Sequence, residues 1–122
     1  MTAVEPARTP LTIDDYELDK ALDAAATAYT NALAPDLPPL AWSHRYESGR
    51  RRPVLSGQVA YFTYPGRFVE VAQQWAERLG LAESEDTLPG QRMWFGAALG
   101  RFGDVRVWCI VDRAAWDRAG ER

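Results

Sequence analysis

The sequence predicts an α+β fold in the order α-β-β-α-β-β, with a four-stranded antiparallel sheet and two helices on one of its faces. Two segments with the apolar spacing of amphipathic helices, near residues 13–34 and 65–80, each precede a pair of segments in which large and polar side chains alternate. A chain of 122 residues with 47% hydrophobic residues has the size and apolar content of one domain around one core. Packing both helices on one sheet face is the simplest arrangement for this order.

The first helix is expected to follow a flexible N-terminal arm over residues 1–11 and to end before Pro35. The segment from Thr12 to Asp15 offers capping side chains and acids, which the positive end of the helix dipole favours. Apolar residues recur at spacings of four and three, and this stripe predicts the side that faces the sheet: Leu18, Leu22, Ala25, Tyr29 and Leu33. The acidic face, with Asp15, Asp19 and Asp23, is expected to be solvated.

The first hairpin is predicted over residues 40–46 and 55–63, joined by a basic turn at 48–53. The second helix is expected to begin near Pro65 and to end at Gly80, because glycine suits a left-handed cap and Leu81 can fold back onto the last turn.

The second hairpin is predicted over residues 92–99 and 105–111, after an acidic surface loop at 83–86. Residues 113–118 are expected to form one short helical turn that packs Trp116. The single domain is therefore expected to span 12–118, and 119–122 are expected to be a flexible C-terminus.

The alternation within each strand predicts which side chains face the helices, because neighbouring residues point to opposite faces of a sheet. The inward set is Leu40, Trp42, His44, Tyr46, Val59, Tyr61, Met93, Phe95, Ala97, Leu99, Val105, Val107, Cys109 and Val111. The outward set is Arg45, Gln58, Phe62, Arg92, Trp94, Arg106 and Trp108.

The outward set would form a larger aromatic patch than a monomer normally exposes, and Arg and Trp are enriched at the centres of protein interfaces. We expect a non-enzymatic protein-binding or regulatory module whose contact residues bind a partner protein or a second copy in a homodimer: Arg45, Phe62, Arg92, Trp94, Arg106 and Trp108. The alternative is that the arm, or the C-terminal segment with Trp116, folds over this face.

A second functional hypothesis is binding of single-stranded nucleic acid. Arg50, Arg51 and Arg52 form a candidate anion-binding loop, and bases stack on aromatic side chains of open sheets. The formal net charge of −3 counts against this hypothesis, because nucleic-acid modules are usually basic.

The third hypothesis is a small enzyme or ligand-binding protein with an aromatic pocket between helices and sheet, where Trp42, Tyr46, Tyr61 and Trp75 would lie. The residues single out no catalytic group, because His44 and Cys109 are both expected to pack inward without a partner that would activate them. No metal site and no cofactor are predicted, since no Cys, His or carboxylate residues have ligand spacing.

A cytoplasmic location is expected. The apolar runs are only a few residues long, the N-terminus lacks the pattern of a secretory signal, and there is one cysteine. Arginine outnumbers lysine by 13 to one and there are 19 alanines, a bias that predicts a high-GC bacterial source.

The segments Leu37-Pro-Pro-Leu-Ala-Trp42, Ser56-Gly-Gln-Val59 and Trp75 to Leu81 resemble small uncharacterised proteins of high-GC bacteria and their mobile elements. The resemblance covers the middle third of the chain. It implies no catalytic or binding residue, and it favours an accessory role of the immunity, anti-defence or regulatory kind.

Overall fold

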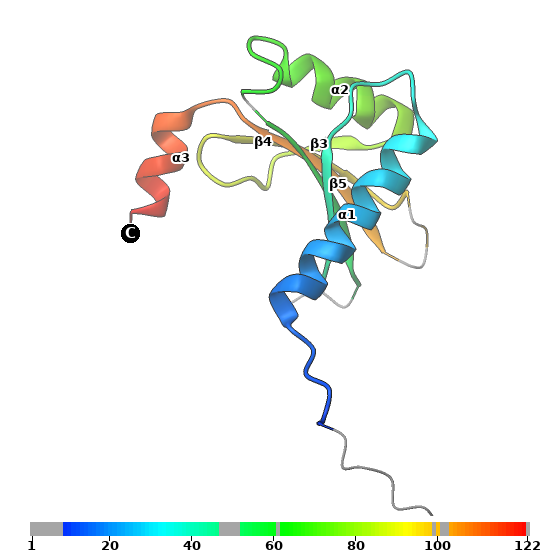
Figure 1. Ribbon diagram of the computed structural model, residues 1–122. Helices are drawn as coiled ribbons and strands as arrows, with labels where there is room; N and C mark the ends of the chain where they lie inside the picture. Colours follow the sequence, from blue (N-terminus) through cyan, green and yellow to red (C-terminus); the bar gives the residue numbers. More distant parts are fainter. Residues whose placement is uncertain (1–8, 47–51, 61, 99, 101–102, 122) are drawn as a thin grey trace, which may run out of the picture.

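The computed structural model describes residues 9–46, 52–60, 62–98, 100 and 103–121, and within them the chain forms three helices and a five-stranded mixed sheet (Figure 1). The helices are α1 (Asp15–Leu33), α2 (Phe68–Leu79) and α3 (Arg113–Gly120). The strands are β1 (Ala41–Arg45), β2 (Val54–Val59), β3 (Ala82–Ser84), β4 (Gln91–Gly96) and β5 (Asp104–Ile110). Their order across the sheet is β1-β2-β5-β4-β3.

The α+β class and both predicted hairpins are confirmed, but the prediction of four antiparallel strands with two helices is wrong. Strands β1 and β2 pair antiparallel, as do β4 and β5, whereas the two hairpins meet through a parallel pair of β2 and β5. The fifth strand, β3, lies where an acidic loop was expected and pairs with β4 at the edge of the sheet. Helix α3 is longer than the single turn that was predicted, and it reaches Gly120.

Helix α2 covers one face of the sheet and supplies most of the helical side of the core. Its residues Val71, Ala72 and Trp75 are buried against the central strands. Trp75 packs edge-on to Trp42 with 5.2 Å between ring centroids, and its indole N–H donates to the carbonyl oxygen of Pro38 at 2.7 Å. The predicted cap is confirmed, because Gly80 is left-handed and the Leu81 N–H donates to a carbonyl of the last turn.

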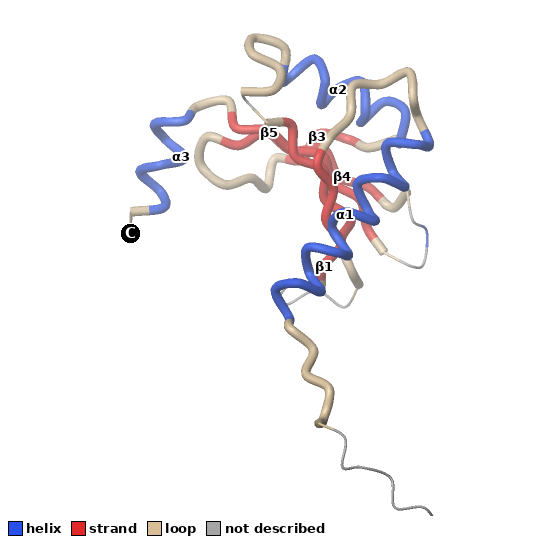
Figure 2. Tube along the Cα trace, viewed as in Figure 1, coloured by secondary structure: helices blue, strands red, loops and turns tan. Residues whose placement is uncertain are grey.

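Helix α1 runs along the outer edge of β1, which is the edge strand of the sheet. The two elements lie next to each other in the tube view (Figure 2). The Thr27 hydroxyl accepts from the Trp42 N–H at 2.9 Å and lies 3.1 Å from the Trp42 carbonyl oxygen, to which it can donate. The Asn31 amide bonds the N–H and the carbonyl of Leu40 in the same way. These two side chains thus satisfy edge backbone groups that would otherwise be free to pair with another strand.

This docking contradicts the predicted orientation of α1. The stripe that was expected to face the sheet is exposed at Leu18, Leu22, Tyr29 and Leu33. The side that contacts β1 instead carries Thr27, Thr30 and Asn31, with Ala34 buried at its end. Hydrogen bonding to the strand edge, together with packing of the small side chains of Ala26 and Ala34 against the core, therefore fixes the orientation of the helix.

The inward and outward assignment is correct for β5 and wrong for β4. Val105, Val107 and Cys109 are buried under α2 as predicted. Trp94 is paired with Val107 and belongs to the same core cluster, so it faces inward and not outward. Both Met93 and Trp94 are buried, one on each face, and a strand that is apolar on both sides gives no clear alternation.

Four other residues of the inward set also depart from the prediction. His44, Tyr46, Ala97 and Val111 are exposed at or beyond the ends of their strands, while Tyr61 and Leu99 lie outside the described residues. Leu40, Trp42 and Val59 are buried as expected.

Candidate binding trough on the open sheet face

The face of the sheet opposite α2 is bordered by α1 on the β1 side and by α3, which follows β5 (Figure 1). Gln58, Trp108 and Met93 lie in one row across this face, because Gln58 is paired with Trp108 and Trp108 with Met93. Two adjoining cavities lie on it, and together they are called the trough below.

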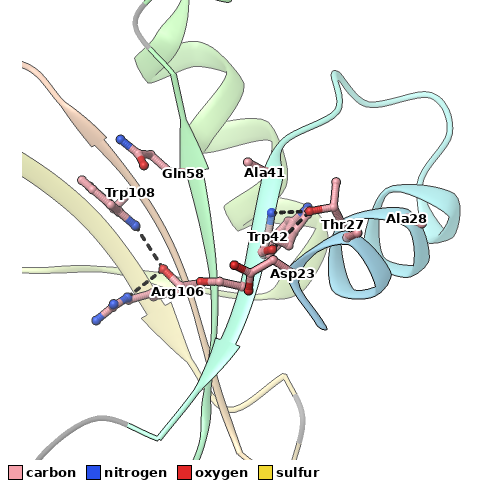
Figure 3. Close-up of a pocket in the computed structure, with 11 residues that line it drawn as sticks. Asp23, Thr27, Ala28, Ala41, Trp42, Gln58, Arg106 and Trp108 are labelled. Atoms are coloured by element: carbon pink, nitrogen blue, oxygen red, sulfur yellow. Dashed lines mark hydrogen bonds between the residues drawn. The ribbon is translucent and has the colours of Figure 1, made fainter. Parts of the chain in front are cut away.

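The first cavity has a volume of about 600 Å³ and lies between α1 and the sheet (Figure 3). Its lining combines small residues with polar and aromatic ones: Asp23, Ala24, Thr27, Ala28, Ala41, Trp42, Ser43, Ser56, Gln58, Arg106 and Trp108. Small side chains on α1 and at Ala41 of β1 leave this space open beside Arg106 and Trp108 of β5.

Ser56 holds the side chains of Arg106 and Trp108 in place. Its buried hydroxyl oxygen accepts from Arg106 Nε at 2.9 Å and from Trp108 Nε1 at 3.1 Å, as the dashed lines of Figure 3 show. Side chains fixed in this way lose less rotamer freedom when a ligand binds, because part of the ordering cost is met on folding. Arg106 and Trp108 are therefore preorganised.

The α1 side of the trough carries a balanced charge pair. Arg45 donates from Nη2 to Asp23 Oδ2 at 2.8 Å, and its Nη1 lies 2.7 Å from Asp23 Oδ1. The hydrogen bond to Asp23 raises the pKa of the Arg45 guanidinium from its ordinary value. This wall is thus polar without adding a net positive charge.

The second cavity, of about 390 Å³, lies on the other side of Arg106 and Trp108 and is also lined by Leu88, Gln91 and Met93. Trp116 of α3 borders it and stacks on Trp108, with 5.6 Å between ring centroids and 30° between ring planes. Trp116 thus covers one side of Trp108. This agrees in part with the alternative in which the C-terminal segment folds over this face of the sheet.

The structure brings together only some of the predicted contact residues. Arg106 and Trp108 lie in the trough with Gln58, and Arg45 lies beside it through its bond to Asp23. Arg92 lies on the other face, stacked over Trp94 at 5.0 Å and bonded to Glu83 at 2.7 Å. Phe62 is exposed in the connection after β2 and borders a separate cavity.

The predicted anion-binding loop is described only at Arg52, because Arg50 and Arg51 lie outside the described residues. Arg52 donates to the carbonyl oxygens of Gly100 and Gly103 and lies 3.6 Å from the Asp104 carboxylate. It therefore ties the start of β2 to the start of β5.

Sequence reasoning missed Ser43, Ser56, Thr27 and Asp23 as trough residues. Ser56 lies two residues before Gln58 on β2 and points to the same face of the sheet, so the alternation of that strand already placed it on the outward side. Thr27 and Asp23 gave no such signal, because their place depends on how α1 is turned against β1.

The only cysteine and histidine lie apart from the trough lining. Burial raises the pKa of the Cys109 thiol to about 11. His44 is exposed on β1. Among the described residues, no group of three or more His, Cys, Asp or Glu side chains is placed to hold a metal ion, and none of the described helices is long and apolar enough to cross a bilayer.

The chain matches no known family model, and neither a curated protein nor a solved structure is significantly similar to it. Fold and trough thus define it as an α+β module with a tryptophan and an arginine fixed on an open sheet face.

Proposed function

We propose that this chain is a non-enzymatic protein-binding module of an accessory kind, such as an immunity, anti-defence or regulatory protein, and that the trough receives a segment of its partner. The observation that carries the proposal is the bonding of Arg106 and Trp108 to one buried hydroxyl, that of Ser56, in a cavity open to solvent. Tryptophan and arginine held in this way have the character of interface hot spots.

The chemistry of the trough favours a segment that carries a carboxylate and an apolar side chain. The Arg106 guanidinium bonds Ser56 through Nε, and a guanidinium is a planar group whose N–H donors match the shape and charge of a carboxylate. The indole of Trp108 offers an apolar surface beside it, and the Gln58 amide can both donate to and accept from a peptide backbone.

The dimensions of the trough suit an extended chain. From β1 to β4 the face spans three gaps between strands, or roughly 14 Å, which four or five extended residues would cross. Because the two cavities adjoin at Arg106 and Trp108, such a segment would contact both of these side chains at its centre.

The two other hypotheses draw less support from the geometry. Arg45, Arg67, Arg78 and Arg92 each bond a carboxylate, which weakens the positive field that a nucleic-acid backbone requires. An enzyme pocket between α2 and the sheet would need the space that Trp42 and Trp75 fill as core residues.

Selection from a displayed library of random peptides, followed by affinity measurement through tryptophan fluorescence, tests this proposal. We expect the selected peptides to combine acidic with aromatic or aliphatic residues. Arg106→Ala and Trp108→Ala should each weaken binding by roughly tenfold or more, because both truncations remove a central contact. Ser56→Ala should weaken it by a smaller factor, since both side chains remain but lose their shared acceptor.

The matched control is Arg92→Ala, which removes an arginine stacked on a tryptophan from the opposite face. It should bind selected peptides as the wild type does. Equal losses in Arg92→Ala and Arg106→Ala would contradict the proposal, as would a library from which nothing binds. Salt-sensitive binding of a labelled oligothymidylate that depends on Arg106 would favour the nucleic-acid hypothesis instead.

A further inference from the structure

Helix α1 exposes an apolar stripe that no described part of the chain covers. Leu18, Leu22, Tyr29 and Leu33 expose 46, 49, 69 and 59% of their surfaces. Exposed alanines flank the stripe, and no residue from 24 to 33 carries a charge. Trough residues Asp23 and Thr27 lie on another side of the helix, so the stripe and the trough are separate surfaces.

The stripe is large enough to contribute substantially to a stable interface. Its four large side chains expose on the order of 500 Å², and the flanking alanines add to this, against roughly 800 Å² per partner in a standard complex. An exposed apolar patch of this size is at the upper end of what monomers show and commonly marks an interaction surface.

The spacing of the stripe is symmetric about its midpoint, which lies between Ala25 and Ala26. Leu22 and Tyr29 lie at equal distances on either side of this point, roughly 5 Å along the axis, and Leu18 and Leu33 lie at roughly 11 Å. A two-fold interface requires this property, because residue i of one copy must meet residue j of the other while j meets i. The small side chain of Ala25 at the midpoint would let two helices cross closely.

The charges of α1 select an antiparallel pairing. Asp15, Glu17 and Asp19 lie in the first two turns, with Lys20 close by, and the second half of the helix is uncharged. Parallel helices would place the acidic turns of both copies side by side, whereas antiparallel helices place each acidic turn beside an uncharged one. The helix dipoles also oppose each other in the antiparallel arrangement.

We propose that the exposed stripe of α1 binds the same stripe of a second copy, in an antiparallel two-fold pair. Leu18 then packs against the partner's Leu33, Leu22 packs against the partner's Tyr29, and the two helices cross at Ala25. This homodimer does not use the sheet face, so the proposal of a homodimer can be tested independently of the proposal that the trough binds a partner.

Light scattering coupled to size exclusion tests the association. The wild type should elute with twice the mass of one chain at micromolar concentration. Leu22→Glu should elute as a monomer with an unchanged circular dichroism spectrum, because the side chain is half-exposed and makes no core contact. The control Leu88→Glu makes the same change at an exposed leucine beside Trp116, and it should remain dimeric.

Single cysteines test the register, with wild type as the background because Cys109 is buried. Ala25→Cys should form a disulfide-linked dimer under mild oxidation, because the two copies of this residue meet at the crossing point. Leu18→Cys should not, since the two copies would lie roughly 22 Å apart along the axis.

Three results would overturn the proposal: a monomeric wild type, a dimeric Leu22→Glu, or cross-linking of Leu18→Cys as efficient as that of Ala25→Cys, which would indicate parallel helices. Peptide binding by Leu22→Glu separates the two proposals. We expect the monomeric variant to bind trough-selected peptides with unchanged affinity, and a failure of peptide selection would leave the dimer proposal intact.

Discussion

Cys109 shows how burial controls the chemistry of a single side chain. The thiol lies in the core row of β5 under α2, completely shielded from solvent. Burial raises its pKa to about 11, and the nearby Arg92 offsets this only in part. Because the thiolate is the reactive form of cysteine, the folded protein should hold this thiol inert at neutral pH.

We therefore expect the thiol reagent DTNB to label Cys109 rapidly in denaturant and at least a hundredfold more slowly in the native protein at pH 8. Equal rates in the two states would show that the thiol is accessible and would contradict its placement in the core.

The raised pKa of Cys109 also makes the free energy of unfolding depend on pH. A thiol whose pKa is higher in the folded than in the unfolded state stabilises the fold fully below pH 9, and this contribution is lost as the pH rises toward 11. The free energy of unfolding should fall by up to about 1.4 kcal/mol per pH unit in that window. Urea unfolding of Cys109→Ala should lack this component of the slope, and identical slopes would contradict it.

At the scale of elements, the contact between α1 and β1 depends on one asparagine. Asn31 donates from Nδ2 to the Leu40 carbonyl at 2.8 Å, and its Oδ1 accepts from the Leu40 N–H and from Trp42 Nε1, both at 3.0 Å. One side chain thus joins the helix to the strand edge and also orients a core tryptophan.

Asn31→Ala should lower the free energy of unfolding by about 2–4 kcal/mol, because three partly buried polar groups lose their partner at once. The control is Thr27→Ser, which keeps the hydroxyl that bonds Trp42 and should cost less than about 1 kcal/mol. Urea denaturation measures both. If both variants lose the same stability, Asn31 does not hold the helix in place.

This contact also explains what the sequence could predict of α1 and what it could not. The spacing of Leu18, Leu22 and Tyr29 correctly predicted a helix, because an amphipathic pattern indicates the element. It placed the wrong side against the sheet, because an apolar stripe is buried equally well by the core or by a second molecule. The side that docks on β1 carries Thr27 and Asn31, whose role is visible only once the strand edge is in place.

The strands show a similar limit. Val105, Val107 and Cys109 alternate with polar or half-exposed neighbours, so the face to which each side chain of β5 points could be predicted. This includes the position of Arg106 and Trp108 on the trough side. Strand β4 is apolar on both faces at Met93 and Trp94, so the face to which each of its side chains points could not be predicted. The three-residue strand β3 carries no apolar pattern, and it forms because the edge of β4 offers it a partner.

At the scale of the whole molecule, the chain pattern left open which strands of the two hairpins would meet. The structure joins them through β2 and β5, and a parallel pair needs a long crossover, which here contains α2. This arrangement brings Ser56 beside Arg106 and Trp108, and α3, which follows β5, brings Trp116 onto Trp108. The trough is therefore a product of topology.

The docking of α3 depends on close approach to Gly90, the turn before β4. Gly90 has a φ of 80°, and its carbonyl accepts from the N–H of Val111 at 2.7 Å and of Asp112 at 3.2 Å. A methyl group added there would meet the Asp112 carbonyl oxygen and would lie 2.8 Å from the Trp116 amide nitrogen. The backbone at the start of α3 thus leaves no room for a side chain.

Gly90→Ala should therefore displace α3, separate Trp116 from Trp108 and lower the free energy of unfolding by about 3 kcal/mol or more. The matched control is Gly66→Ala, which has a similar φ of 72° but open space around the added methyl group. It should cost only the backbone strain of about 1–2 kcal/mol. Near-ultraviolet circular dichroism reports on the stacked tryptophans, so the spectrum should change in Gly90→Ala alone. Equal costs and equal spectra would mean that α3 is held by other contacts, and that Trp116 forms a wall of the trough independently of the Gly90 turn.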